Sequence, residues 1–167
     1  MVDFADVIVS FVQDISYSYV LRNSCITRYE EDTAFKDMID DGTPCYDSIT
    51  YGFNTPAEFI TSLHGDCDTR TVFLFKLMSH FGYDVAILSS NFYRHSILGI
   101  SMPGVGDFLE FRGKKYYVWE TTNTGWQRGV IPPNNSNLSY WEVCITNEAI
   151  LWKTKSWKQQ TLLSICH

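Results

Sequence analysis

Residues 64–70 read HGDCDTR and run directly into an apolar segment, TVFLFKLMSHFG at 71–82. This change from small polar residues to a long apolar run predicts a helix that begins near Cys67 and ends near Phe81. Gly82 is a suitable stop, because glycine readily adopts the left-handed backbone conformation that ends many helices. A lone thiol therefore lies at the start of a helix and not within its apolar run.

The first turn of this predicted helix has residues suited to its positively polarised end. Asp66 or Gly65 can serve as the N-cap, and the negative charge of Asp68 interacts favourably with the positive end of the helix dipole. The unsatisfied N–H groups and the dipole at that end favour a thiolate, which is a physical reason for a reactive cysteine. At about 100° per residue, one broad face of the helix carries Cys67, Arg70, Thr71, Leu74, Met78 and Phe81. Its large apolar members need a packing partner, so we expect the face to point toward a sheet.

The rest of the chain predicts helices first and strands second. Residues 3–20 favour a helix followed by an extended stretch, residues 22–54 look irregular with a short helix within 30–40, and a further helix starts at Asn54-Thr55-Pro56 and runs to 63. After Gly82, short apolar or alternating runs predict strands: YDVAILSS, RHSILGI, DFLEF, KKYYVWETT and a last one near 141–146. This order predicts an α+β fold in which the N-terminal helices and the helix from Cys67 pack on a largely antiparallel sheet.

Length and composition favour one soluble domain over residues 1–167. Hydrophobic residues make up 45% and aromatic residues 16% of the chain, which is enough material for a packed core. The net charge is −6 and no basic run occurs, so we expect no nucleic-acid partner. No apolar run is long enough to cross a bilayer, and no basic leader is seen, so we expect a cytoplasmic chain without membrane insertion. If the chain is a domain excised from a longer protein with neighbouring domains, an extracytoplasmic location is the alternative.

Five cysteines occur, and none forms a CxxC pair, so the usual spacing of structural zinc sites is absent. We therefore expect no metal and no cofactor. A zinc site built from His64, Cys67 and His95 would lack an identifiable fourth ligand. The other four cysteines could form two disulfides outside the cell or be ordinary thiols inside it, and the absence of a recognisable leader favours thiols; they are Cys25, Cys45, Cys144 and Cys166.

A nucleophilic cysteine needs a base, and the base needs an orienting partner. His95 opens the predicted strand RHSILGI, and Glu120 lies in the predicted strand KKYYVWETT, on the same face as Val118. If the two strands are neighbours, the carboxylate can accept a hydrogen bond from one ring nitrogen while the other nitrogen faces the thiol. The remaining histidines, His64, His80 and His167, are weaker candidates for the base.

Several segments together resemble the transglutaminase-like superfamily of papain-like cysteine enzymes, in its prokaryotic branch with GDC, H and E-T-T motifs. GDCDTRTVFLFKLMSHFGYDVAIL resembles the nucleophile helix, RHSIL the histidine strand and YYVWETTNTGW the third motif. FVQDISYSY resembles the opening of the branch, and TPAEFI resembles the segment before the nucleophile. The resemblance covers roughly residues 8–130, and the order and spacing of the motifs make it specific.

The resemblance implies a papain/transglutaminase-like fold in which Cys67 is the nucleophile, His95 the general base and acid, and Glu120 the orienting carboxylate. The Cys67 thiolate would attack an amide carbonyl, His95 would protonate the leaving amine, and a thioester would form. The oxyanion would lie near the Cys67 N–H group. Two departures bear on the substrate: glutamate replaces the more usual aspartate, and Ser96 and Ile97 follow the histidine.

Nothing in the sequence specifies a second amine substrate, so hydrolysis of an amide or isopeptide bond in a protein or peptide substrate ranks above cross-linking. A silent binding or scaffolding domain of the same fold is a further alternative, and a thiol-redox role lacks a nearby resolving cysteine. Three residues are candidates for the substrate cleft: Trp126 lies in a loop just past the acid, Gln13 matches a polar position of the branch, and Asp66 could bind a substrate cation.

Overall fold

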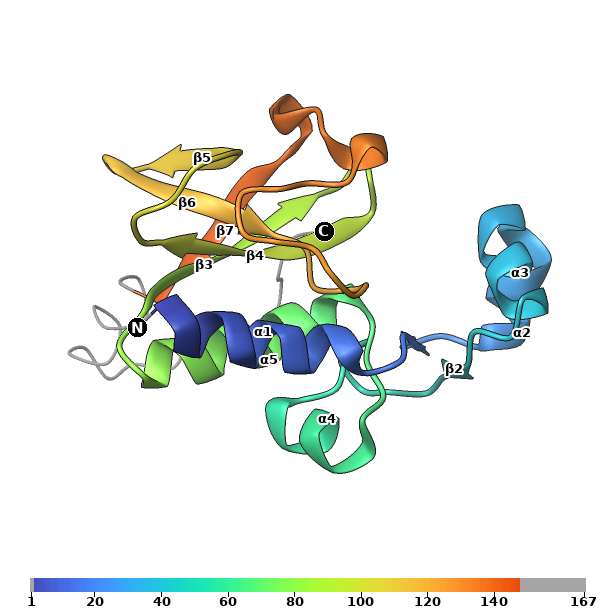
Figure 1. Ribbon diagram of the computed structural model, residues 1–167. Coiled ribbons are helices and arrows are strands. Elements are labelled where there is room, and N and C mark those ends of the chain that lie inside the picture. The colour runs from blue at the N-terminus through green and yellow to red at the C-terminus, as the bar shows by residue number, and fades with distance from the viewer. Residues whose placement is uncertain (1, 148–167) are drawn as a thin grey trace, which may run out of the picture.

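Five α-helices precede a five-stranded antiparallel sheet in the described part of the chain, which is an α+β arrangement (Figure 1). The computed structural model describes residues 2–147, with side chains from residue 4 onward. The helices are α1 (Val2–Asp14), α2 (Cys25–Glu31), α3 (Thr33–Asp40), α4 (Pro56–Ser62) and α5 (Cys67–His80). The strands of the large sheet are β3 (Asp84–Ser90), β4 (His95–Ser101), β5 (Phe108–Phe111), β6 (Lys114–Trp119) and β7 (Glu142–Thr146).

The large sheet has the strand order β5-β6-β4-β3-β7, and each neighbouring pair is antiparallel. In the β3–β4 hairpin Ser90 pairs with His95, and β4 pairs with β6 so that Leu98 lies opposite Trp119. The start of β4 and the end of β6 therefore lie at the same end of the sheet. This register decides which side chains of the two strands can meet.

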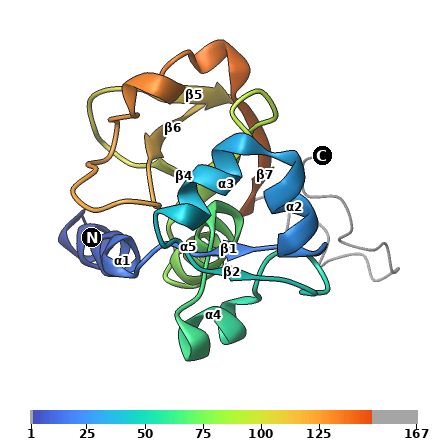
Figure 2. The ribbon, with the colours of Figure 1, turned by 90° about the vertical axis from the view of Figure 1, so that its right-hand side faces the viewer.

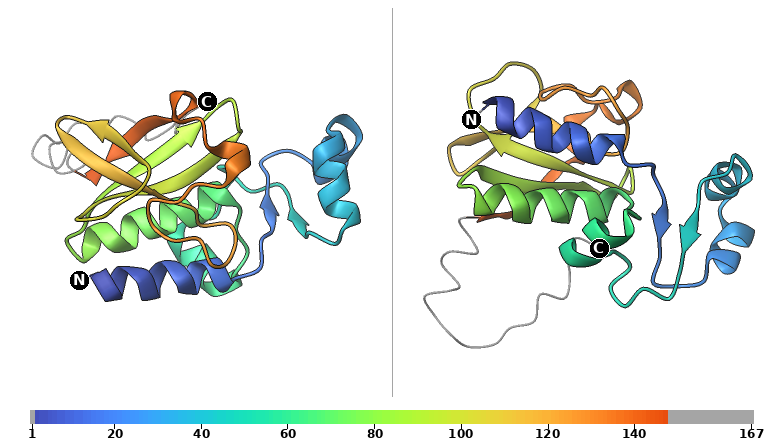
Figure 3. Two further views of the ribbon diagram at one scale, coloured as in Figure 1. Left: turned by 45° about the horizontal axis from the view of Figure 1, so that its top comes forward. Right: turned by 60° about the horizontal axis from the view of Figure 1, so that its bottom comes forward.

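Two hydrophobic clusters cover opposite faces of this sheet, because successive strand residues alternate between its faces. Helices α1 and α5 lie side by side on one face (Figure 3). That face contributes Val85, Ile87, Leu98, Ile100 and Trp119, which pack against helix residues including Val9, Val12, Leu74 and Met78. The other face contributes Ala86, Leu88, Ile97, Tyr116 and Val118, covered by Ile131 and Trp141.

The helix from Cys67 begins where the sequence predicts and ends one residue early. Asp66 is its N-cap, with the side chain accepting a hydrogen bond from the Thr69 N–H at 2.9 Å. Gly82 follows with φ +80°, the left-handed conformation expected at a helix stop. Phe81 is the C-cap, and it is 50% exposed because the buried stripe ends one turn earlier, so its prediction as a packed member of the stripe is wrong.

Residues 22–54 contain more regular structure than predicted, since α2 and α3 both lie there. Two short parallel strands, β1 (Tyr19–Val20) and β2 (Cys45–Tyr46), lie next to α2 and α3, and we call these four elements the lobe (Figure 2). A disulfide joins Cys25 to Cys45 across the lobe. The expectation of ordinary thiols is wrong for these two cysteines, because the β1–β2 pairing brings the start of α2 close to the start of β2.

Cys144 is also disulfide-bonded, so the expected thiol is wrong there too, whereas Cys166 and His167 lie outside the described residues. Within those residues, Cys67 is the free cysteine. No helix between residues 2 and 147 is long and apolar enough to cross a membrane.

Candidate active site

The three predicted catalytic residues meet where their elements begin or end. Cys67 is the first residue of α5, His95 is the first residue of β4, and Glu120 directly follows β6. The register between β4 and β6 places Glu120 diagonally across from His95 on one face, as predicted. The His95 Nε2 atom lies 2.8 Å from Glu120 Oε2.

By alternation, His95 belongs with Ile97 on the face of the sheet that α5 does not cover. The thiol and the imidazole therefore meet around the end of the sheet and not across one of its faces. The His95 ring also contacts Trp141 edge to face, with ring centroids 5.9 Å apart. This indole comes from a segment distant in the chain, so its contact with the imidazole could not be predicted from local sequence patterns.

The His95 ring is hydrogen-bonded to Glu120, and Cys67 is the second group whose interaction raises the pKa of this ring. Because Glu120 occupies Nε2, Nδ1 is the ring nitrogen left to face the thiol. Burial by itself lowers the pKa of His95, but the hydrogen bonds to Cys67 and Glu120, together with their charges, raise that pKa from 6.5 to about 10. The imidazole is therefore held as a cation at neutral pH between a carboxylate and a sulfur atom.

The Glu120 carboxylate is held by hydrogen bonds on both oxygens. Its Oε1 accepts from the Thr121 N–H at 2.8 Å, the Thr122 N–H at 2.9 Å and the Thr122 hydroxyl at 2.7 Å. Burial raises the pKa of Glu120, but the hydrogen bond and charge of His95, with the bonds from Thr122, lower it to about 2. The two threonines of the E-T-T motif thus fix the carboxylate, a role that the sequence analysis did not assign.

The turn before the nucleophile is closely packed. A Cβ atom at Gly65 would lie 2.7 Å from the ring of Phe59 and 2.9 Å from the Thr69 methyl group, so this position has no room for a side chain. Asp66 is 7% exposed; burial and the neighbouring charge of Asp68 raise its pKa from 3.8 to about 7. The Oδ1 atom of Asp66 accepts the capping hydrogen bond from the Thr69 N–H. That Asp66 binds a substrate cation stays a prediction.

Asp68 connects the nucleophile helix to the histidine strand. Its Oδ1 accepts a hydrogen bond of 2.7 Å from the hydroxyl of Ser96, the residue next to His95. Ser96 thereby holds the start of β4 against the first turn of α5. This contact gives Ser96 a structural role at the junction of the two elements.

Gln13 reaches the acid segment from α1. Its side-chain amide donates hydrogen bonds of 2.7 Å to the Glu120 carbonyl and 2.9 Å to the Trp126 carbonyl. Both amide hydrogens are therefore used inside the protein, and Gln13 positions the backbone next to the carboxylate. Trp126 also accepts from the Trp119 indole N–H at 3.2 Å through its carbonyl, and a role of its own side chain in a cleft stays a prediction.

The other described histidines have partners elsewhere. His64 Nε2 lies 2.9 Å from the Tyr46 hydroxyl, and the two rings stack with centroids 3.9 Å apart. His80 contacts Phe81 edge to face. No group of three or more histidine, cysteine, aspartate or glutamate side chains between residues 4 and 147 is placed to hold a metal ion.

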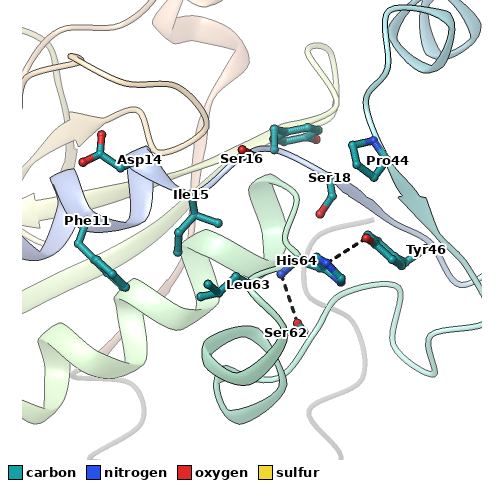
Figure 4. Close-up of a pocket in the computed structure, with 11 residues that line it drawn as sticks. Phe11, Asp14, Ile15, Ser16, Ser18, Pro44, Tyr46, Ser62, Leu63 and His64 are labelled. Carbon is teal, nitrogen blue, oxygen red and sulfur yellow. Dashed lines mark hydrogen bonds between the residues drawn. The ribbon is translucent and has the colours of Figure 1, made fainter.

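Figure 4 shows a pocket whose lining does not include Cys67, His95 or Glu120. It opens between the end of α1, β2 and the segment before α5, and its lining includes Ile15, Tyr17, Tyr46, Leu63 and His64. Burial raises the pKa of the lining residue Tyr17 well above its usual value, and the charges of Cys67 and Asp66 raise it further.

Compared with models of protein families, with curated proteins and with solved structures, the chain matches none of them. The geometry of Cys67, His95 and Glu120 therefore carries the functional interpretation.

Proposed function

We propose that this chain is a cysteine-dependent acyl-transfer enzyme of papain/transglutaminase-like type, acting as a peptidase or amidase. One observation carries the proposal: His95 is hydrogen-bonded to the carboxylate of Glu120 at 2.8 Å and also interacts with the free thiol of Cys67. A histidine buried between a free thiol and a fully hydrogen-bonded carboxylate matches the arrangement of nucleophile, base and orienting group. A silent binding domain has no need for a cationic imidazole aligned in this way.

In the proposed mechanism the Cys67 sulfur attacks the carbonyl carbon of an amide. Negative charge moves to the carbonyl oxygen, and the N–H of Cys67 can donate to it, because the first residue of a helix has no intrahelical acceptor for its N–H. The His95 imidazolium then gives its proton to the leaving nitrogen, the C–N bond breaks and a thioester remains. Glu120 keeps the ring aligned and stabilises its charge throughout.

The neutral imidazole left by this step can accept a proton from water as water attacks the thioester, which releases the acid and restores the thiolate and imidazolium pair. Hydrolysis needs no second substrate. An amine in place of water would give transamidation by the same steps. A protein or peptide amide, including an isopeptide, is the substrate class that this chemistry serves.

The proposal is tested first by the reactivity of the thiol. Wild-type protein and the His95→Ala variant are treated with iodoacetamide from pH 5 to pH 9, and the labelled residue is located by mass spectrometry. We expect Cys67 to be alkylated rapidly at pH 6, and His95→Ala to slow this by at least about tenfold because the neighbouring positive charge is lost. His80→Ala, on the same helix but away from the triad, is the matched control.

Turnover is then measured with a panel of peptides and isopeptides by the release of new amines. Cys67→Ala should abolish any release, and acid quenching of the wild type should trap the substrate acyl group on Cys67 as a thioester. Slow alkylation of Cys67 with no effect of His95→Ala would contradict the proposal.

A further inference from the structure

Arg70 is a cation buried completely within the fold, one turn after the nucleophile on α5. It has no exposed surface, and its guanidinium donates four hydrogen bonds, all to backbone carbonyl oxygens. The distances are 3.0 Å from Nε to Gly65, 3.0 Å and 3.1 Å from Nη1 to Val12 and Thr121, and 2.6 Å from Nη2 to Ile15.

These carbonyls belong to the segments that carry the proposed active site. Gly65 lies two residues before Cys67, and Thr121 directly follows Glu120. Val12 and Ile15 flank the end of α1, from which Gln13 reaches the Glu120 carbonyl. One side chain thus ties together the approach to the nucleophile, the exit from the carboxylate and the end of the first helix.

The charge of Arg70 has no direct counter-ion. None of the ion pairs formed within residues 4–147 includes Arg70, and the aromatic ring of Tyr17 lies 5.6 Å from the guanidinium carbon. The acidic groups that interact with it at longer range are those of Tyr17, Asp66, Cys67 and Glu120. Its field therefore acts on the sulfur and the carboxylate without being cancelled by a contact ion pair.

Fold stability alone does not require an arginine here. The side chain occupies a fully buried position of α5, on the face that also carries Leu74 and Met78, where an apolar residue of similar volume is often at least as stabilising as a charge. Among possible side chains, the planar fork of arginine can bind several separate carbonyls at once, whereas lysine offers a single point of attachment.

We infer that Arg70 is a positioning residue of the proposed active site, which aligns the Cys67 and Glu120 segments and supplies positive charge beneath the thiolate. This inference rests on the proposed function. It assigns to α5 a second role besides carrying the nucleophile. Arg70 gives its four hydrogen bonds to carbonyl oxygens and therefore acts through the backbone of its neighbours.

The test compares Arg70→Lys, which keeps the charge but not the fork, with Arg70→Met, which keeps neither. Met78→Ala is the matched control, because it weakens the packing of the same helix at a buried position away from the four carbonyls. For each full-length protein, circular dichroism establishes the folded temperature range. Within it, the rate of Cys67 alkylation is measured from pH 5 to pH 9.

We expect Arg70→Met to slow alkylation at pH 6 by about tenfold or more and to move the midpoint of the pH profile upward, since about tenfold in thiolate fraction accompanies each pH unit. Arg70→Lys should retain part of the charge effect and give an intermediate rate. Met78→Ala should keep the wild-type profile even though it melts earlier.

The inference would be overturned if folded Arg70 variants kept the wild-type pH profile of Cys67 alkylation, or if Met78→Ala changed that profile in the same way. It would also be overturned if both Arg70 variants failed to fold while Met78→Ala folded, because Arg70 would then serve stability alone. A wild-type Cys67 that reacts no faster than an ordinary thiol would instead contradict the proposed function. The wild-type and variant measurements therefore separate the two.

Discussion

Replacing Glu120 by glutamine keeps the size of the side chain and removes the negative charge that faces His95. In the native protein, burial raises the pKa of Glu120, and its interactions with His95 and Thr122 outweigh this to lower the pKa from 4.5 to about 2. At about 1.36 kcal/mol per pKa unit, the ionised carboxylate gains roughly 3 kcal/mol from these partners. The same charge stabilises the imidazolium, because the interaction is mutual.

We therefore expect Glu120→Gln to lower the pKa of His95 from about 10 toward roughly 8, because the lost charge is worth about two pKa units. A loss of about two pKa units, or about 2.7 kcal/mol, of imidazolium stabilisation would slow hydrolysis of the thioester by up to about 100-fold, because His95 gains a proton in that step. The His95 ring is titrated by NMR through its carbon and nitrogen shifts, and turnover is measured on the same samples.

Glu110→Gln is the control, because it makes the same chemical change at an exposed position of β5. It should leave the His95 titration unchanged. If Glu120→Gln folds and His95 titrates as in the wild type, the carboxylate does not hold the imidazole as a cation, and the reasoning from the 2.8 Å contact fails.

Three further predictions follow from the same geometry. The folded-state pKa of Glu120 is lowered and that of His95 is raised, so the pair stabilises the fold fully between about pH 4.5 and 6.5. This contribution declines as the pH falls toward 2 or rises toward 10. Urea unfolding across this range measures it, and an unfolding free energy that does not change with pH would show that the pair contributes nothing. Gly65→Ala should cost about 1–3 kcal/mol of unfolding free energy, because the new methyl group meets a buried aromatic ring at 2.7 Å, whereas Gly104→Ala, facing a flexible arginine, should cost less; equal losses would contradict the packing argument. Ser96→Ala removes the 2.7 Å hydrogen bond that joins β4 to α5 and should cost about 1 kcal/mol in the same assay, together with slower Cys67 alkylation; an unchanged rate would show that this bond does not position the triad.

Much of the local structure could be predicted from the sequence. The helix from Cys67 follows from its cap, its apolar run and Gly82, all of which act within a few residues. The helix starting at Pro56 is confirmed, with a capping box between Thr55 and Glu58. The strands from 84 to 119 are confirmed for the same reason, since alternation is a property of neighbouring residues.

The candidate triad could be proposed because thiol, imidazole and carboxylate each lie at the end of a predicted element. What the sequence could not reveal was the partnership of Glu120 with Thr122, the link from Ser96 to Asp68 and the burial of Arg70 among carbonyls. Each depends on how segments distant in the chain fold against one another. The disulfide between Cys25 and Cys45 was missed for the same reason.

The sequence by itself therefore determined the helix that presents Cys67 and the strand that begins at His95, because capping, periodicity and turn formation are short-range effects. Only the tertiary structure decided that the imidazole meets the sulfur around the end of the sheet. That meeting depends on the register of β4 against β6, and a shift by one residue would turn Glu120 to the opposite face. The register is fixed by the packing of the whole sheet and its two hydrophobic clusters, which no short segment specifies.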